Sequence, residues 1–527
     1  MDQLALLFIV LLGVVVLVPV GDRLNLPAPV LMTLFGAALA LLPFVPNVAI
    51  NPELILPLVL PPLLYASVQR TSWRQFAANR RPIFLLAVAL VFVTMLVVAA
   101  VAHATVPGLP PAAAFALGAL VAPPDPVAAT AVAGRLGLPR RMVSILEGEG
   151  LFNDVTAIVL YHVAIAAAVT GSFSWPPAVG ELVLSAVVAI VVGLVLGWIA
   201  HKMMGVLGDV NLQIGLSLLV PFASYAIAEE LRGSGVLAVL TTALFLSEHM
   251  SDADDVTGRL AGDTFWSIVD TMVTGAAFGL IGLELHNVFG TAAHADRLLT
   301  GAALVVAAVV GVRLAWLLPA AWLAQRLHRK RDVAEEIPAT WRETVVMWWS
   351  GMRGVASVAL ALAVPLKTAG GAAFPGRDAI LFIAFAVVLV SLVLQGLTLP
   401  WLVRRLGVGK DDAAEREFER KLAVRAAKAA RRRLKEIEEV EELPEEMRET
   451  LSRRAYDIGA RISPDVVEAE KRDAVRRRHK RLRKIQRIQG ELLSAARHEV
   501  LAARSEPGAD PEVVDRVLHD LDVRSLH

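Results

Sequence analysis

Long apolar stretches recur through the first 406 residues and are separated by short polar loops. A helix needs about 20 consecutive apolar residues to cross the hydrocarbon core of a bilayer. We therefore expect an all-α polytopic membrane protein with about thirteen transmembrane helices. They are predicted near residues 3–20, 27–45, 52–69, 82–106, 111–133, 142–170, 180–205, 211–229, 233–249, 265–286, 298–325, 340–365 and 378–403.

Two of the predicted helices are interrupted. Prolines flank Asp125 in the fifth helix, and proline removes a backbone donor and clashes with the preceding turn. The segment Ser350–Gly354 of the twelfth helix places two glycines around Arg353. Corresponding breaks in the two halves of a transporter point to its substrate site, because the released carbonyls need partners such as a dehydrated cation. The simpler interpretation is a proline kink and a glycine packing contact, which the charges at both breaks disfavour.

Composition divides the chain in two. The protein is 56% hydrophobic with a mean hydropathy of +0.59, and soluble proteins are roughly 45–50% apolar. More than half of its 51 Lys+Arg and of its 50 Asp+Glu follow Gly407. We expect a transmembrane domain over residues 1–406 and a charged helical cytoplasmic tail over residues 407–527. The absence of cysteine excludes disulfides, iron–sulfur clusters and thiolate metal sites.

Basic residues gather in alternate loops, and the loops between them are almost uncharged. By the positive-inside rule the basic loops are cytoplasmic, which places the N-terminus outside and the tail in the cytoplasm of a multi-pass plasma-membrane protein. The first apolar segment lacks the basic start of a signal peptide and is expected to remain as a transmembrane helix. The basic loops contain Arg70, Arg74, Arg80, Arg81, Arg135, Arg140, Arg141, Lys202, Arg326, Arg329, Lys330 and Arg331.

The tail pattern predicts mixed-charge helices near Ala413–Glu442, Glu445–Arg461 and Pro464–Arg504. Within the third, the basic run Arg476–Arg481 is expected to be a solvated helix face, with contact to anionic lipid as the alternative. The sequence has no phosphate-binding glycine loop or nucleotide signature. We expect neither a nucleic-acid partner nor enzymatic activity, and regulation or dimer contact remain open as roles for the tail.

Asp154 follows Asn153 inside the predicted sixth helix, and Asp125 lies in the broken fifth. A carboxylate at membrane depth is costly, so its default interpretation is functional. A desolvated carboxylate beside a like charge tends to hold a proton, and as an anion it offers hard oxygen ligands to a small cation. Competition between H⁺ and a monovalent cation for Asp154 and Asp125 would produce exchange.

Other polar residues of the sixth helix have supporting roles. Glu149 shares a helix face with Asn153 and needs a partner if it is buried, for which Arg353 is the obvious choice. Such a pair would be structural, because a guanidinium stays charged. The amide of Asn153 can tie the sixth helix to the broken backbone of the fifth, but it cannot titrate. An asparagine in place of a second aspartate therefore favours electroneutral exchange.

At these residues the chain resembles the bacterial sodium/proton exchangers of the monovalent cation:proton antiporter family. The matching stretches follow one another in the family's order and cover the whole membrane domain. They are Leu60–Tyr65 with Thr71–Arg74, Ala122–Asp125, Leu146–Asp154, Ala228–Glu229 with Ser234–Ala238, Phe278–Leu283 and Gly351–Val355.

The resemblance implies a thirteen-helix inverted-repeat fold, in which a mobile core moves elevator-fashion against a dimerisation domain. It implies a homodimer in membrane lipid that exchanges Na⁺, or Li⁺ or K⁺, for H⁺ without a cofactor. By position Asp154 resembles the essential cation and proton carboxylate and Asp125 the second acid. The resemblance further implies a ligand role for the Pro124 carbonyl, a linking role for Asn153 and a supporting ion pair between Glu149 and Arg353.

Three positions depart from the family pattern. Ala66 stands where a glutamate is frequent, Gly150 where a serine is usual, and Pro124 where threonine is common. The site therefore offers fewer side-chain oxygens, which affects ion selectivity and affinity more than the exchange mechanism.

Three other functions share part of this pattern. A K⁺-selective antiporter would share these residues, and a passive cation channel would not need a titrating acid. An intramembrane aspartyl protease also places two aspartates in membrane helices, but neither its Tyr-Asp nor its Gly-x-Gly-Asp motif lies in a predicted span.

Overall fold

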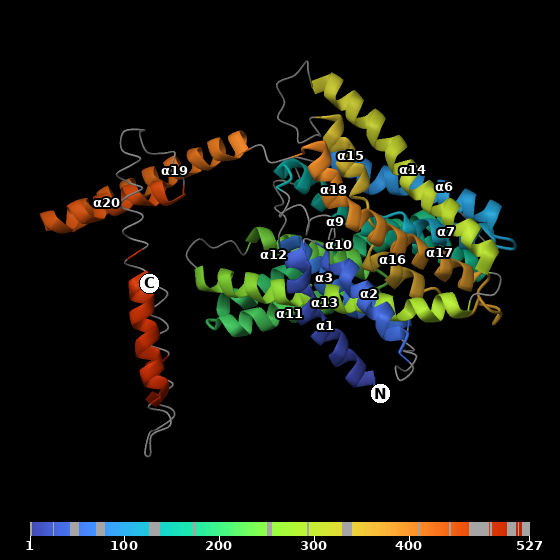
Figure 1. The fold of residues 1–527 in the computed structure, drawn as a ribbon, viewed down its shortest axis with the longest axis horizontal. Helices are drawn as coiled ribbons and strands as arrows, with labels where there is room; N and C mark the ends of the chain where they lie inside the picture. Colours follow the sequence, from blue (N-terminus) through green and yellow to red (C-terminus); the bar gives the residue numbers. More distant parts are fainter. Residues whose placement is uncertain are drawn as a thin grey trace. The chain divides into compact units, whose positions relative to one another are not determined.

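The chain is nearly all helical wherever the computed structural model describes it (Figure 1). It divides into two compact units, Met1–Lys410 and Asp411–His527. The described residues are 3–24, 26–42, 52–69, 80–125, 137–171, 175–249, 256–291, 295–328, 340–408, 412–441, 444–462, 484, 487–502, 513–514 and 516–518.

The first unit contains the apolar helices. Two short π-helical segments, η1 (Leu85–Leu90) and η2 (Ser391–Gln395), join α5 to α6 and α17 to α18. The α-helices are α1 (Gln3–Leu24), α2 (Ala28–Ala40), α3 (Pro52–Gln69), α5 (Arg80–Phe84), α6 (Val91–Thr105), α7 (Pro111–Val121), α9 (Arg140–Thr170), α10 (Trp175–Val206), α11 (Val210–Glu230), α12 (Gly235–His249), α13 (Val256–Thr291), α14 (Ala295–His328), α15 (Trp341–Trp349), α16 (Val355–Leu362), α17 (Arg377–Val390) and α18 (Gly396–Leu406).

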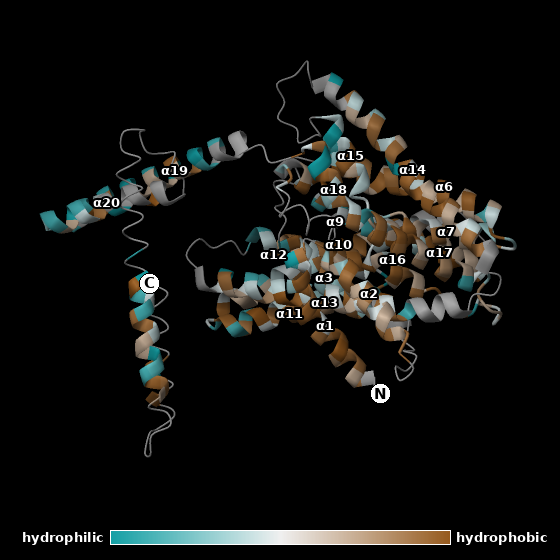
Figure 2. Cartoon of the chain, viewed as in Figure 1, coloured by the Kyte–Doolittle hydropathy of each residue, from teal (hydrophilic) through white to brown (hydrophobic). Residues whose placement is uncertain are grey.

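Eight helical segments within the described residues are long and apolar enough to cross a membrane. Shorter apolar helices are α2, α7 and α12. The long helices are coloured largely as hydrophobic (Figure 2). Many of their large apolar side chains are exposed, as are Leu184, Ile190 and Trp198 on α10. Outward apolar faces suit a protein whose solvent is lipid, because lipid tails are as apolar as the side chains themselves. The eight segments are Leu4–Leu24, Arg81–Thr105, Met142–Thr170, Val183–Val206, Val210–Glu230, Gly258–Glu284, Leu298–Leu323 and Arg377–Leu406.

The helices of the first unit form two groups by their contacts. We call α1–α3 with α10–α13 the first helix group, and α5–α7, α9 and α14–α18 the second (Figure 1). Within the first group, α2 packs along α13 and α10 along α12; within the second, α6 packs on α7 and α14, and α7 packs on α9. The groups meet where α3 contacts α9 and α16, and where α13 contacts α16 and α17.

Glycines bring α2 and α13 into close backbone contact. A side chain at Gly36 would overlap the backbone of Gly279, and one at Gly282 would overlap the carbonyl of Thr33. Small residues allow this approach in membrane helices, where packing rather than water exclusion holds helices together.

We expect Gly282→Ala to lower the stability of the protein by about 1–3 kcal/mol, because the added methyl group forces the α2–α13 backbones apart. The measurement is thermal unfolding of detergent-purified protein. Gly262→Ala on the same helix is the control, since open space surrounds its Cβ position. Equal melting temperatures for the two variants would contradict the close crossing.

Both predicted breaks are present. Helix α7 ends at Val121, and Ala122–Asp125 continue without helical structure. Helix α15 ends at Trp349 and α16 begins at Val355, so Gly351–Gly354 form an extended connection. The rest of the predicted fifth span, residues 126–133, lies outside the described residues. The basic loops at 70–79, 126–136 and 329–339 lie outside them as well.

The second unit contains the charged helices α19 (Asp412–Val440) and α20 (Glu445–Ile462), which pack on each other. Surface pairs such as Arg420–Glu417, one turn apart, line α19; exposed pairs of this kind contribute little stability. Residues 487–502 are also helical. The basic run Arg476–Arg481 and the start of the predicted third helix fall outside the described residues.

Candidate functional site

The two interrupted segments meet in the second helix group. The backbone N–H of Asp125 donates a hydrogen bond to the carbonyl of Met352 at 2.6 Å. The Asp125 carboxylate lies directly against Gly354, so that a Cβ at position 354 would overlap it. The prolines before Asp125 and the glycines around Arg353 thus create one crossing of non-helical backbone at the centre of the helix group. We refer to residues 122–125 and 350–354 as the crossing.

Helix α9 places its polar residues beside this crossing. The Nδ2 group of Asn153, a fully buried residue, donates to the Pro124 carbonyl at 2.6 Å. This is the tie between the sixth predicted helix and the broken fifth that the sequence suggested. A carbonyl oxygen has two lone pairs, so the Pro124 oxygen keeps the capacity to bind a second donor or a cation.

Asp154, the residue after Asn153, is partly buried and lies close enough to Asp125 for the two charges to interact. The Asp125 carboxylate and the Pro124 carbonyl of the segment after α7, and the Asp154 carboxylate of α9, therefore gather at the crossing. Within the described ranges, His, Asp and Glu side chains do not form a group of three or more that could hold a metal ion. Gly150, one turn before Asp154 on α9, is buried and supplies no side-chain oxygen.

Glu149 has a different partner from the one expected. Its carboxylate binds Arg313 of α14 through both oxygens, with Nη1 on Oε1 and Nη2 on Oε2 at 2.8 Å. The side chains are 2% and 1% exposed. The predicted Glu149–Arg353 pair is therefore wrong. A guanidinium can donate two parallel hydrogen bonds to the two oxygens of a carboxylate, and Arg313 binds Glu149 in this bidentate way.

Arg353 binds backbone carbonyls instead. Its Nε donates to Val121 at 3.0 Å and its Nη2 to Ala122 at 3.2 Å, while Nη1 donates to Gly351. The last carbonyls of an interrupted helix lack intrahelical partners, and a guanidinium with five donors satisfies several of them at once. Arg353 thereby joins the end of α7 to the extended segment before α16.

The sequence reasoning missed Arg313. It lies in the apolar run Val309–Leu317 of α14, and the rule that singled out Asp154 applies equally to an arginine at membrane depth. Its side chain also passes so close to Gly351 that any larger residue there would overlap it. The two glycines of the crossing therefore have separate purposes, since Gly351 accommodates Arg313 and Gly354 accommodates Asp125.

We expect Gly354→Ala to slow transport about a hundredfold, because the new methyl group displaces the Asp125 carboxylate. A displacement of about 1 Å at a functional group can reduce a rate by about that factor. Gly311→Ala is the matched control: Gly311 lies on α14 in the same helix group, with open space at its Cβ position. The measurement is initial cation-dependent proton flux in proteoliposomes. Equal rates in both variants would contradict the contact between Gly354 and Asp125.

Ala66, the first departure from the family pattern, is buried in an apolar cluster with Tyr65, Leu240 and Trp266. The ring centroids of Tyr65 and Trp266 are 4.4 Å apart. A glutamate at position 66 would require a polar partner in this cluster, and the alanine needs none.

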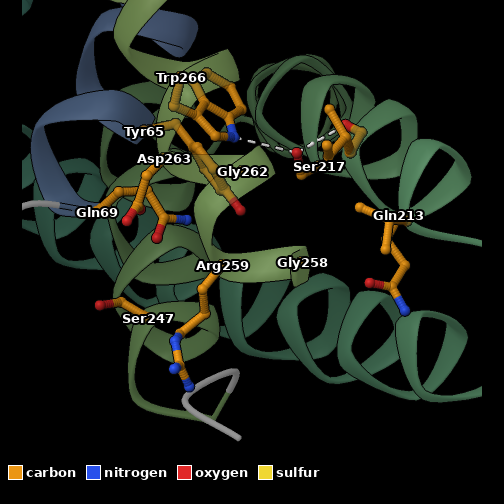
Figure 3. A pocket seen from close by; sticks show the side chains of 12 residues that line it. Tyr65, Gln69, Gln213, Ser217, Ser247, Gly258, Arg259, Gly262, Asp263 and Trp266 are labelled. Atoms are coloured by element: carbon orange, nitrogen blue, oxygen red, sulfur yellow. Dashed lines mark hydrogen bonds between the residues drawn. The ribbon is translucent and has the colours of Figure 1, made fainter. Parts of the chain in front are cut away.

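A separate cavity of about 240 Å³ lies among α3, α11, α12 and α13 of the first helix group (Figure 3). Tyr65, Gln69 and Asp263 line it, and Trp266 donates to Ser217 beside it at 3.1 Å. Neither Asp125 nor Asp154 lines this cavity, so it is distinct from the crossing.

Comparison with known proteins gives concordant results. Residues 7–405 match the family described as sodium/hydrogen exchanger, transmembrane. A protein of Mycobacterium tuberculosis named an uncharacterized Na⁺/H⁺ exchanger is 35% identical over 415 residues, covering 77% of this chain and 75% of the relative. The uncharacterized Na⁺/H⁺ exchanger YjcE of Escherichia coli is 30% identical over 523 residues, 95% of this chain and 93% of the relative.

The solved structure of the sodium proton antiporter MjNhaP1 from Methanocaldococcus jannaschii is similar in fold. Its TM-score is 0.60 at 19% sequence identity, and the match covers 76% of this chain and 98% of that one. The family match over residues 7–405, the two relatives and the apolar helices agree on a multi-pass membrane antiporter, which is a transporter and not an enzyme. The chain belongs to the sodium/hydrogen exchanger family.

Proposed function

We propose that the protein exchanges a monovalent cation, principally Na⁺, for H⁺ across the plasma membrane. The cation and the proton compete for Asp154 and Asp125. The observation that carries this proposal is the meeting of the two carboxylates with the Pro124 carbonyl at the crossing.

The chemistry follows from these groups. A cation that leaves water needs oxygen ligands to replace its hydration shell, and carboxylates with a backbone carbonyl are the hard ligands that it prefers. A proton on either carboxylate removes the charge that attracts the cation. Each ion therefore displaces the other, and the site crosses the membrane loaded with one or the other.

Supporting residues hold this site in place. Asn153 fixes the Pro124 carbonyl, the Glu149–Arg313 pair fixes α9 against α14, and Arg353 satisfies the carbonyls of the crossing. Asn153 cannot carry a proton, so we assign one proton per cation and an electroneutral cycle.

An alternating-access cycle is supported by the two helix groups, which are joined by limited contacts of α2, α3 and α13 with elements of the second group and η2. The second group, with the site inside it, moves elevator-fashion against the first.

In this arrangement thirteen spans place the N-terminus outside and the tail in the cytoplasm. Residues 1–406 form the exchanger domain and residues 407–527 the tail, whose basic run is solvated or contacts anionic lipid. The first helix group provides the interface of a homodimer.

The test is a series of cations added to proteoliposomes that contain the purified protein, a pH-sensitive dye and an imposed pH gradient. Na⁺, and to differing degrees Li⁺ and K⁺, should dissipate the gradient. A response to K⁺ alone would identify a K⁺-selective antiporter. Cation flux without obligatory proton flux would identify a channel and overturn the proposal.

A further inference from the structure

Helix α16, which begins directly after the crossing, contains a hydroxyl-bearing residue that the sequence motifs did not single out. Ser357 lies in the first turn of α16, is 1% exposed, and its Oγ has no hydrogen-bond partner among the described residues. A buried hydroxyl without a partner forfeits its hydrogen bonds to water, so such a group calls for an explanation.

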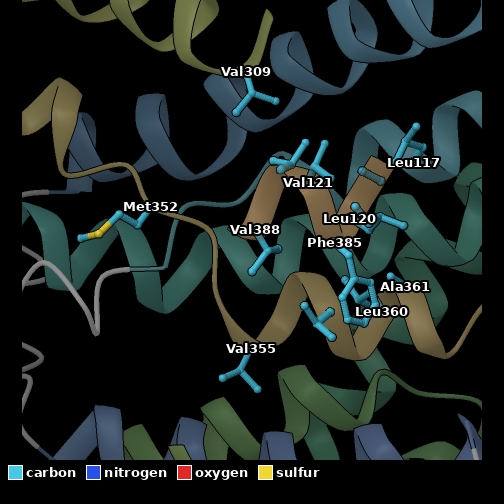
Figure 4. Close-up of a cluster of buried hydrophobic side chains, with 14 of the residues drawn as sticks. Leu117, Leu120, Val121, Val309, Met352, Val355, Leu360, Ala361, Phe385 and Val388 are labelled. Atoms are coloured by element: carbon cyan, nitrogen blue, oxygen red, sulfur yellow. The ribbon is translucent and has the colours of Figure 1, made fainter. Parts of the chain in front are cut away.

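The position of Ser357 on its helix directs it toward the crossing. It follows Gly354 by three residues, and residues three apart on a helix are neighbours on the same side, about 5–6 Å between Cβ atoms. Gly354 contacts the Asp125 carboxylate. Leu360 and Ala361, one turn further on the same side, belong to the apolar cluster with Leu117 and Leu120 of α7 (Figure 4).

A second oxygen near the crossing is also without a partner. Asn153 donates through Nδ2 to Pro124, and its buried Oδ1 has no hydrogen-bond partner among the described residues. Thr94, an equally buried hydroxyl of the same helix group, donates to the Leu90 carbonyl at 2.7 Å. The hydroxyl of Tyr161, further along α9, is a third buried oxygen without a partner among the described residues. The oxygens of Ser357 and Asn153 therefore give the surroundings of Asp125 and Asp154 hydrogen-bonding capacity that no described group uses.

We infer that the Ser357 hydroxyl is a direct ligand of the transported cation and replaces the hydroxyl that Gly150 does not provide on α9. This inference rests on the proposed exchange function. Asp125, the Pro124 carbonyl and the Ser357 hydroxyl then approach the cation from the two broken segments, and Asp154 approaches it from α9. A hydroxyl ligand carries no charge, so it binds the cation without changing the number of protons exchanged.

The test compares Ser357→Ala with Thr94→Val, which removes an equally buried hydroxyl that already has a partner. Ser357→Ala should raise the apparent KM for Na⁺ about tenfold with little change in maximal rate, which corresponds to roughly 1.4 kcal/mol of lost binding. Thr94→Val should leave the KM within about twofold of the parent value. An unchanged KM in Ser357→Ala, in a protein whose parent exchanges Na⁺ for H⁺, would overturn the inference and leave the exchange function standing.

Ser357→Cys provides a signature that a purely structural serine would not give. Sulfur is a soft ligand, so the cysteine variant should lose affinity for Na⁺ and retain or gain affinity for Tl⁺. The Tl⁺/Na⁺ preference should rise at least about fivefold over the parent. Equal changes for both cations would indicate a packing role and contradict direct ligation. Lack of exchange by the parent protein itself would instead refute the proposed function.

Discussion

Asp154→Asn should abolish cation-dependent proton flux. The amide keeps the size of the carboxylate and removes both the negative charge that binds the cation and the site that accepts the proton. Loss of a charge partner for a desolvated ion costs several kcal/mol, so we expect at least a thousandfold reduction. The measurement is initial dye response to Na⁺ in proteoliposomes at matched protein density.

Asp270→Asn is the matched control for this prediction. Asp270 is another aspartate of a membrane helix, but it lies on α13 in the first helix group, where its carboxylate accepts a bond from Thr274 at 3.4 Å. That variant should exchange at close to the parent rate. An Asp154→Asn protein that exchanged Na⁺ at the parent rate would eliminate Asp154 as the transport carboxylate.

Arg313→Ala should destabilise the protein by about 3–5 kcal/mol, because it leaves the Glu149 carboxylate buried without its partner. The expected result is a much lower melting temperature in detergent and poor recovery from the membrane. Glu149→Gln should cost less than Arg313→Ala, because the amide oxygen still accepts a hydrogen bond from the Arg313 guanidinium and the Met347 carbonyl accepts another.

A double-mutant cycle separates the pair found in the structure from the pair expected from the sequence. Substitutions at 149 and 313 should show a coupling energy of about 0.5–3 kcal/mol, larger than the coupling between 149 and 353. Arg353 binds the carbonyls of Val121 and Ala122 and acts on Glu149 only through its charge, so its coupling to Glu149 should be the smaller of the two. Stronger coupling of Glu149 to Arg353 would favour the original assignment.

Local chemistry allowed the breaks to be predicted. Prolines around Asp125 and glycines around Arg353 act on their own segments, through missing donors and conformational freedom, so their effects can be predicted without knowledge of the fold. The apolar runs similarly predict membrane helices. Eight helical segments meet the criteria of length and apolarity within the described residues, so the total of thirteen stays a prediction.

The partner of Glu149 could not be predicted in the same way. Arg313 and Arg353 are both arginines at membrane depth, and Glu149 is 164 residues from one and 204 from the other. The choice between them depends on where the fold places α14 relative to α9 and on which carbonyls the break at Val121 exposes. These are consequences of tertiary structure. The contact of Asp125 with Gly354 likewise becomes visible only when the broken segments are placed together.

The dependence of the Na⁺ affinity on pH tests the central claim most directly, namely that cation and proton compete for one site. The measurement is the apparent KM for Na⁺ in proteoliposomes over a series of pH values on the Na⁺ side, with the pH on the opposite side held constant. Competition predicts that the KM rises as the pH falls, approaching tenfold per pH unit where the proton dominates, while the maximal rate at saturating Na⁺ stays constant. A KM independent of pH, with a maximal rate that falls instead, would show that the proton binds elsewhere and would contradict the account.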